Sequence, residues 1–267
     1  MVILRVFPRR TSFTPTDVLA FVGDPPLWRP LVDEVHVSIT FTWDIAEGQR
    51  LKEAWENYYP CVKIGGPAFG DRPDGFVPGV YVKPGVTFTT RGCNNRCPWC
   101  LVPEHEGKLI EIEDFAPGYI IQDNNLLQAS PRHIEKVFTM LRTQKRAAIF
   151  SGGLQASLIG DPEARLINSI RVAKLFLAAD TEAQLPSLAR ALKRLSFLDR
   201  RKLGVYAMIG LETLEEAQWR LEMIWKLGGL PFAQLYQPAD KWIDYSPEWK
   251  AFVRTWSRPA AMFALHQ

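Results

Sequence analysis

The amino-acid sequence predicts a mixed α/β protein. We expect a partial (β/α)6 TIM-like barrel, preceded by a small N-terminal Rossmann-like α/β fragment and followed by a C-terminal helix. Two observations lead to this fold class: six short apolar runs follow one another after residue 85, and amphipathic helical patterns separate most of them. Such an alternation is typical of parallel strands joined by right-handed crossovers, and six units suit an open barrel better than the closed eightfold one.

The composition is that of a globular protein. Of the 267 residues, 47% are hydrophobic and 12% are aromatic, which predicts a large core and excludes a disordered chain. No apolar stretch approaches the roughly 18 residues of a membrane span, and the first residues lack the apolar region of a signal peptide. We therefore expect a cytoplasmic protein without membrane partners. The net charge of +3 permits an anionic partner but does not require one.

Residues 1–80 are expected to form the N-terminal fragment and its linker. The segment Glu34–Trp43 alternates apolar and polar side chains, which predicts a strand with one apolar face. Asp44 is predicted to cap the following helix, and Cys61–Ile64 to form the next strand. The residues 66–85 are rich in proline and glycine and are predicted to form a linker. We expect the barrel helices to cover the apolar strand face, so that the fragment packs on the barrel.

Residues 81–240 are expected to form the barrel, and residues 241–267 a C-terminal helical extension. Each expected strand is short and apolar, and polar or glycine residues follow several of them. The expected barrel strands are Val86–Arg91, Tyr119–Gln122, Ala147–Phe150, Ala173–Ala179, Leu203–Ile209 and Phe232–Tyr236.

Helix starts are recognisable from residues that satisfy the free N–H groups of a first helical turn or that lack such a group. A leucine stripe from Leu185 to Leu195 predicts a further helix, and Pro259 is predicted to bound the last one. The predicted starts are Ser130-Pro131, Asp161-Pro162, Thr213 with Glu216 three residues later, and Ser246-Pro247.

Three of the four cysteines, Cys93, Cys97 and Cys100, fall within eight residues, whereas Cys61 stands apart. Three interpretations compete. A [4Fe–4S] cluster on three thiolates would leave one iron open for a further ligand. Structural zinc would need His105 as a fourth ligand, and Cys97 with Cys100 has the spacing of a dithiol redox pair. The spacing favours the cluster, because a C-x3-C-x2-C run is less generic than C-x2-C. Cys61 is expected to be an inert core thiol.

The cysteine segment resembles the C-x3-C-x-aromatic-C motif of radical S-adenosylmethionine (SAM) enzymes, with Trp99 as the aromatic residue. It follows the first expected barrel strand, where that family places its motif. The strings YIIQDNNLL and VYAMIGLETLEE are similar to segments of the cobalamin-domain and methylthiotransferase branches. The resemblance covers about residues 80–240.

The resemblance implies a [4Fe–4S] cluster on the three cysteines and SAM on the open iron. It implies further SAM contacts from Trp99 and from Gly152 and Gly153, a pair similar to the glycines that hold the SAM amino group. Asp180 would bond the ribose hydroxyls or merely cap the next helix. Ile209 would lie beside the adenine, although a core position at a strand end is the simpler explanation.

The expected activity is reductive cleavage of SAM to a 5′-deoxyadenosyl radical, which takes hydrogen from an unidentified substrate. A reductant such as flavodoxin or ferredoxin is the implied partner. The alternatives are a zinc-stabilised binding protein that uses Cys93, Cys97, Cys100 and His105, and a cobalamin-dependent radical methyltransferase. The cobalamin signature D-x-H-x-x-G is absent, so the N-terminal fragment is expected not to bind that cofactor.

A nucleic-acid substrate is compatible with the sequence, although it contains no recognisable RNA-binding module. Basic residues are frequent on and after one amphipathic helix, where the simplest expectation is a solvated face. They are Arg190, Lys193, Arg194, Arg200, Arg201 and Lys202.

Overall fold

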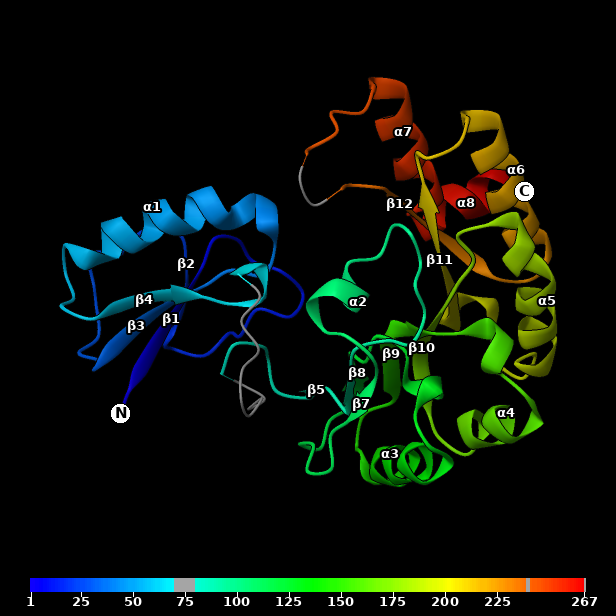
Figure 1. The fold of residues 1–267 in the computed structure, drawn as a ribbon, viewed down its shortest axis with the longest axis horizontal. Coiled ribbons are helices and arrows are strands. Elements are labelled where there is room, and N and C mark those ends of the chain that lie inside the picture. Colours follow the sequence, from blue (N-terminus) through cyan, green and yellow to red (C-terminus); the bar gives the residue numbers. More distant parts are fainter. Residues whose placement is uncertain (70–79, 239–240, 267) are drawn as a thin grey trace. The chain divides into compact units, whose positions relative to one another are not determined.

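A computed structural model of the chain describes residues 1–69, 80–238 and 241–266. The chain divides into two compact units, Met1–Val86 and Thr87–Gln267. Both combine helices with parallel strands, which confirms the mixed α/β class (Figure 1). Within the described ranges, no helix has both the length and the apolar character that crossing a bilayer requires.

The first unit contains a four-stranded parallel sheet in the order β2-β1-β3-β4. Helix α1 lies against it, and Leu51 and Trp55 of this helix share a core with Val35 and Val37 of β3. The elements are β1 (Ile3–Phe7), β2 (Ala20–Val22), β3 (Glu34–Ser38), α1 (Ile45–Glu56) and β4 (Val62–Gly65).

Three expectations for this unit are wrong in detail. The strand that was expected to reach Trp43 ends at Ser38, and Trp43 lies in a 3-10 helix with its ring stacked on Phe41. The apolar face of β3 is covered by α1 of the same unit and not by helices of the second unit, because a β-α-β arrangement supplies its own helix. Asp44 makes no side-chain capping bond; its buried carboxylate pairs with Arg9 instead.

The second unit contains a six-stranded sheet in the order β12-β11-β10-β9-β8-β5. All six segments predicted from the sequence contribute a strand, and neighbours along the chain are neighbours in the sheet. The pairs from β8 to β12 are parallel. The strands are β5 (Val86–Thr87), β8 (Ile120–Ile121), β9 (Ala148–Leu154), β10 (Val172–Ala178), β11 (Leu203–Ile209) and β12 (Leu230–Leu235).

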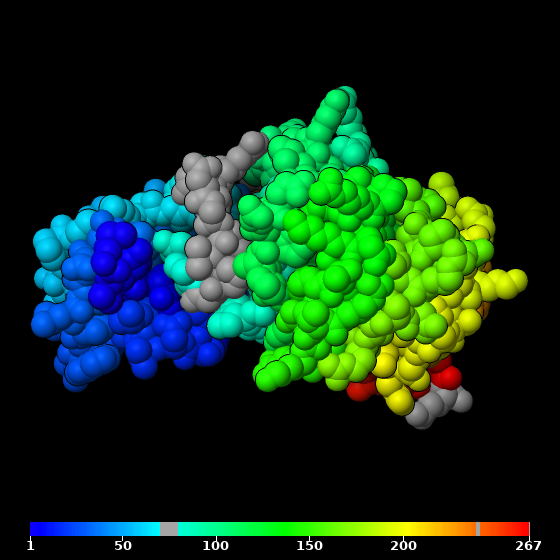
Figure 2. Space-filling model, turned by 90° about the horizontal axis from the view of Figure 1, so that it is seen from below, coloured from blue at the N-terminus to red at the C-terminus, as the bar shows by residue number. Residues whose placement is uncertain are grey.

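Helices connect the strands of this unit. In Figure 1, α3 to α6 follow one another in an arc along one side of the sheet, and Figure 2 shows α3 and α4 in green at the surface. Ser130 and Thr213 cap α3 and α6 as predicted. These helices are α3 (Pro131–Thr143), α4 (Asp161–Asn168), α5 (Leu185–Arg194) and α6 (Leu214–Lys226).

Two helices, rather than the expected one, follow the last strand. They are α7 (Pro247–Trp256) and α8 (Pro259–Leu265). Pro259 does not end a helix but starts α8, because its fixed φ and missing N–H suit a first helical position. Trp256 and Met262 are buried in the same core as residues of α3 to α6.

The cysteine segment lies between two short antiparallel strands, β6 (Thr90–Arg91) and β7 (Ile110–Glu111), and includes the single-turn helix α2 (Val102–His105). Short 3-10 helices complete the described fold. They occupy Thr42–Asp44, Pro67–Phe69, Leu126–Gln128, Ala156–Leu158, Glu182–Gln184 and Arg200–Lys202.

Candidate functional site

The candidate site gathers at the carboxyl ends of the second unit's strands. The cysteine segment follows β5, and the residues that contact it follow β8, β9 and β10. Parallel strands place the loops at their carboxyl ends along one edge of the sheet, which is where α/β folds build sites from distant residues.

A buried carboxylate fixes the start of the cysteine segment. Asp123, which follows β8, is only 2% exposed. Its Oδ1 accepts hydrogen bonds from the backbone N–H groups of Thr89 (2.6 Å) and Thr90 (3.1 Å), and its Oδ2 accepts one from the Thr89 hydroxyl. Burial raises the pKa of Asp123, and these donors oppose the rise. The carboxylate therefore holds the chain in place shortly before Cys93.

A second carboxylate, Glu106, closes the loop from the other side. Its oxygens accept from the Gly92 N–H (2.9 Å), from Asn124 Nδ2 (2.7 Å) and from the Arg91 guanidinium (2.9 Å). Gly92 has a φ of +76°, and a Cβ there would lie 2.2 Å from the carbonyl oxygen of Lys108. Only glycine fits this turn without a rearrangement.

Four side-chain amides clamp the loop to the strand ends. We call Asn95, Asn125, Gln128 and Gln155 the carboxamide cluster. Oε1 of Gln155, which follows β9, accepts from Asn95 (3.0 Å), Asn125 (2.8 Å) and Gln128 (3.1 Å). Three segments of the chain thus meet on one oxygen atom.

The carboxamide cluster reaches the first cysteine through Gln128. Oε1 of Gln128 accepts from the Asn94 backbone N–H (2.8 Å) and lies 3.5 Å from the Cys93 sulfur. Asn125 is 4% exposed, and its Oδ1 has no hydrogen-bond partner among the described residues. A buried acceptor without a donor costs free energy, so this oxygen is suited to a bound group with an N–H or O–H.

The three thiols of the loop are free and partly buried. Burial raises the pKa of Cys97 and of Cys100, and the negative charges of nearby Cys93 and Asp180 raise both further. Among the described residues, no three His, Cys, Asp or Glu side chains are gathered tightly enough to hold a metal ion. His105 ends α2 in the same loop.

Asp180 and Trp99, two residues singled out from the sequence, meet in the structure. Asp180 follows β10, and its carboxylate accepts a hydrogen bond from the Trp99 side chain and one of 2.8 Å from the Met208 N–H. Burial raises the pKa of Asp180, and these bonds oppose the rise. The carboxylate links two strand ends and the cysteine loop; the cap of the next turn comes from Thr181 with Gln184.

The two glycine positions in β9, Gly152 and Gly153, require glycine for different structural reasons. A Cβ on Gly152 would lie 1.8 Å from the carbonyl oxygen of Asp123, so the close approach of two strands requires glycine. A Cβ on Gly153 would make only an ordinary contact, 3.8 Å from the Tyr206 ring, but Gly153 has a φ of +91°, which other residues rarely adopt. Both are located beside the carboxamide cluster at the strand end.

Ile209 lies at the end of β11 with its side chain fully buried in the core. Its carbonyl accepts from the Tyr236 N–H (2.9 Å), which is the packing of a core strand end. On the opposite side of the sheet, Tyr206 stacks on Phe176 at 4.3 Å between ring centroids. Burial raises the pKa of Tyr206 to about 12, and its hydroxyl donates to the Ser151 carbonyl.

Sequence reasoning did not find the residues that hold the loop. Neither Glu106 nor the carboxamide cluster as a set belongs to a motif that was identified in the sequence. The only signal available was position: Asn125 and Gln155 come shortly after strands, at the edge where sites form. Comparison with known proteins adds nothing to this picture, since no protein-family model and no curated protein matches the chain.

Proposed function

We propose that the chain is a radical SAM enzyme in which Cys93, Cys97 and Cys100 hold one [4Fe–4S] cluster. The observation that carries the proposal is the position of the cysteine loop. The loop lies at the carboxyl edge of a sheet whose six strands follow chain order, and the carboxylates of Asp123 and Glu106 bind the backbone just before its first cysteine. We take this sheet as a partial (β/α)6 barrel. Three thiols leave one iron of a cubane without a protein ligand.

The surroundings of the loop fit a cofactor of this chemistry. Asn125 offers a buried oxygen that lacks a donor, which suits the amino group of SAM. Asp180 offers a carboxylate already oriented by Met208 and Trp99, which suits ribose hydroxyls. Gly152 lets two strands approach closely and keeps side chains away from this edge. This arrangement does not require the His105 side chain as a fourth ligand.

The reduced cluster would supply an electron to bound SAM, which would yield methionine and a 5′-deoxyadenosyl radical able to take hydrogen from a substrate C–H bond. The protein's own part is to orient and to exclude water. Asp123 and Glu106 fix the roots of the loop, the carboxamide cluster holds its first cysteine, and the half-buried aromatic rings of Phe176, Tyr206 and Phe232 provide an apolar surface on the inner side of the sheet. We expect a cytoplasmic reductant such as flavodoxin or ferredoxin.

Anaerobic reconstitution with iron and sulfide tests the proposal. The product should be brown, contain about four irons per chain, and release 5′-deoxyadenosine when reductant and SAM are added. A colourless protein with one tightly held zinc would contradict the proposal and favour the zinc-stabilised alternative. Retention of stoichiometric corrinoid after desalting from hydroxocobalamin would move the function toward cobalamin-dependent methyl transfer.

A further inference from the structure

The amino ends of the same strands carry a row of cations. They lie in the connections that lead from α3, α4 and α5 into three neighbouring strands, β9, β10 and β11. In these connections, residues 144–147, 169–171 and 195–202, the only acidic residue is Asp199. The row, called the basic rim here, consists of Lys145, Arg146, Arg171, Arg200, Arg201 and Lys202.

The charges of the basic rim are not neutralised within the described part of the chain, where none of the six forms an ion pair. Neutral groups hold the arginines instead. Arg171 donates to the carbonyl oxygens of Gln144 (3.0 Å) and Lys145 (2.7 Å). Arg146 donates to the Tyr119 hydroxyl (2.7 Å).

Two further guanidinium groups lie over aromatic rings. Arg200 is 4.3 Å from the ring centroid of Trp225 and donates to the Trp225 carbonyl, and Arg201 is 5.4 Å from that of Phe263. Favourable charges at helix C-termini explain why cations collect near this edge. This preference does not explain why neutral groups orient these guanidinium groups, which leaves their charges available to an external anion.

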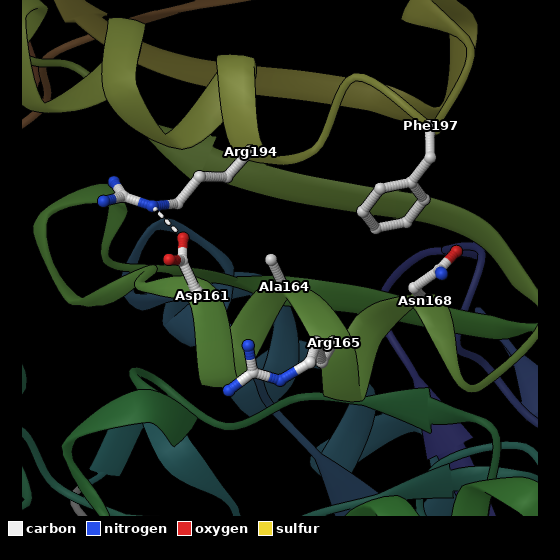
Figure 3. Close-up of a pocket in the computed structure, with 6 residues that line it drawn as sticks. All are labelled: Asp161, Ala164, Arg165, Asn168, Arg194 and Phe197. Atoms are coloured by element: carbon white, nitrogen blue, oxygen red, sulfur yellow. Dashed lines mark hydrogen bonds and ion pairs between the residues drawn. The ribbon is translucent and has the colours of Figure 1, made fainter.

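An open pocket of about 300 Å³ adjoins the basic rim. Figure 3 shows Phe197 and Asn168 at one end of it, the ion pair of Arg194 with Asp161 at the other, and Ala164 between them. Asn168 directly precedes one rim connection and Phe197 lies in another. Phe197 is 43% exposed, so its side chain is accessible to a ligand in the pocket.

We propose that this edge binds single-stranded nucleic acid, with phosphates on the basic rim and one base in the pocket against Phe197. Arginine forks recognise phosphate oxygens by paired hydrogen bonds, and exposed aromatic rings stack on unpaired bases. Asn168 supplies a donor and an acceptor for the edge of that base. The surface is separate from the cysteine loop, so it binds a partner independently of the proposed cluster.

Two features distinguish this partner from an acidic protein. An acidic protein surface would use the cations but not the aromatic pocket between α4 and α5. A reductant would have to dock near the cysteines, yet the rim lies at the far ends of seven-residue strands, roughly 20 Å along the sheet. Both observations favour nucleic acid.

Fluorescence anisotropy with labelled 15-nucleotide poly(U), using the whole chain without metal, tests the proposal. Binding should weaken with salt, and the triple variant Arg146→Gln, Arg171→Gln, Lys202→Gln should reduce the slope of log Kd against log salt by about 2, because each lost phosphate contact contributes about 0.7. Phe197→Ala should weaken binding about tenfold and leave the slope unchanged. Circular dichroism verifies that each variant is folded.

The matched control removes three exposed cations elsewhere: Arg132→Gln, Arg254→Gln, Arg258→Gln. This control should leave the slope within error of the wild type. Equal loss in both triple variants would overturn the proposal, because any cation would then serve. So would the absence of binding at 50 mM salt, tighter binding of a duplex of the same length, or equally effective competition by polyglutamate.

Discussion

The two ends of the second unit's sheet treat positive charge in opposite ways. At the carboxyl end, cations face carboxylates: Arg91 pairs with Glu106, and the buried Arg220 pairs with Glu212 while donating to the carbonyls of Ala179 and Met208. At the amino end, the four arginines of the basic rim donate to carbonyl or hydroxyl oxygens or lie over aromatic rings, and within the described residues none of them pairs with a carboxylate.

The difference indicates that the carboxyl end of the sheet is rigid, whereas the amino end is available to bind an external anion. Ion pairs and carboxamides at the carboxyl end join segments up to 60 residues apart and fix the cysteine loop. Such partly buried pairs hold geometry because breaking one leaves a charge without compensation. Cations oriented by neutral groups keep their charge available for an external anion. Four sets of substitutions test the rigid end of this contrast.

The largest effect is expected from the cysteines. Replacing Cys93, Cys97 or Cys100 by alanine, one at a time, should abolish binding of the [4Fe–4S] cluster, because each would supply a thiolate that no other residue in the loop provides. Iron content and visible absorbance after anaerobic reconstitution measure this. Cys61→Ala and His105→Ala are the controls and should keep the full iron content. Loss of iron in Cys61→Ala would refute the assignment.

The next effect concerns the anchored root of the loop. Asp123→Ala removes the acceptor of three hydrogen bonds and leaves buried donors unpaired, so the free energy of unfolding of the second unit should fall by about 3–5 kcal/mol. Urea unfolding followed by tryptophan fluorescence measures it. Asp114→Ala, an exposed carboxylate in the same segment, should change stability by less than about 0.5 kcal/mol. Similar losses in both variants would show that the anchor contributes nothing special.

A smaller effect is expected from Gln128. Gln128→Leu keeps the size of the side chain but removes the acceptor for the Asn94 N–H and the contact with Cys93. Outer partners of this kind typically change metal retention about tenfold or more. The rate of iron loss to a chelator should therefore rise about tenfold, and Gln128→Glu, which keeps an acceptor, should restore part of the retention. Gln144→Leu, at the other end of the sheet, is the matched control. Unchanged iron loss in Gln128→Leu would mean that the carboxamide cluster only packs.

Local signals in the sequence were sufficient to locate the six strands of the second unit's main sheet and helices α3 to α6. Ser130 and Thr213 start helices because capping depends on residues three positions away. The order of the strands followed from their alternation with helices. The carboxamide cluster could not be predicted from the sequence, because Asn95 and Gln155 are 60 residues apart and meet only in the folded chain. The error at Trp43 has the same origin: alternation continued past Ser38, but strand pairing did not.

The smallest effect separates the two glycines of the rigid end. Gly153→Ala should lower the free energy of unfolding by about 1 kcal/mol, because a φ of +91° is strained for alanine while the nearest atom, in the Tyr206 ring, lies 3.8 Å from the new Cβ. Gly152→Ala should cost more, since its Cβ would lie 1.8 Å from the Asp123 carbonyl oxygen and the strands would have to separate. Thermal unfolding of both variants measures the difference. If Gly153→Ala were the more damaging substitution, backbone strain rather than close strand contact would define this edge.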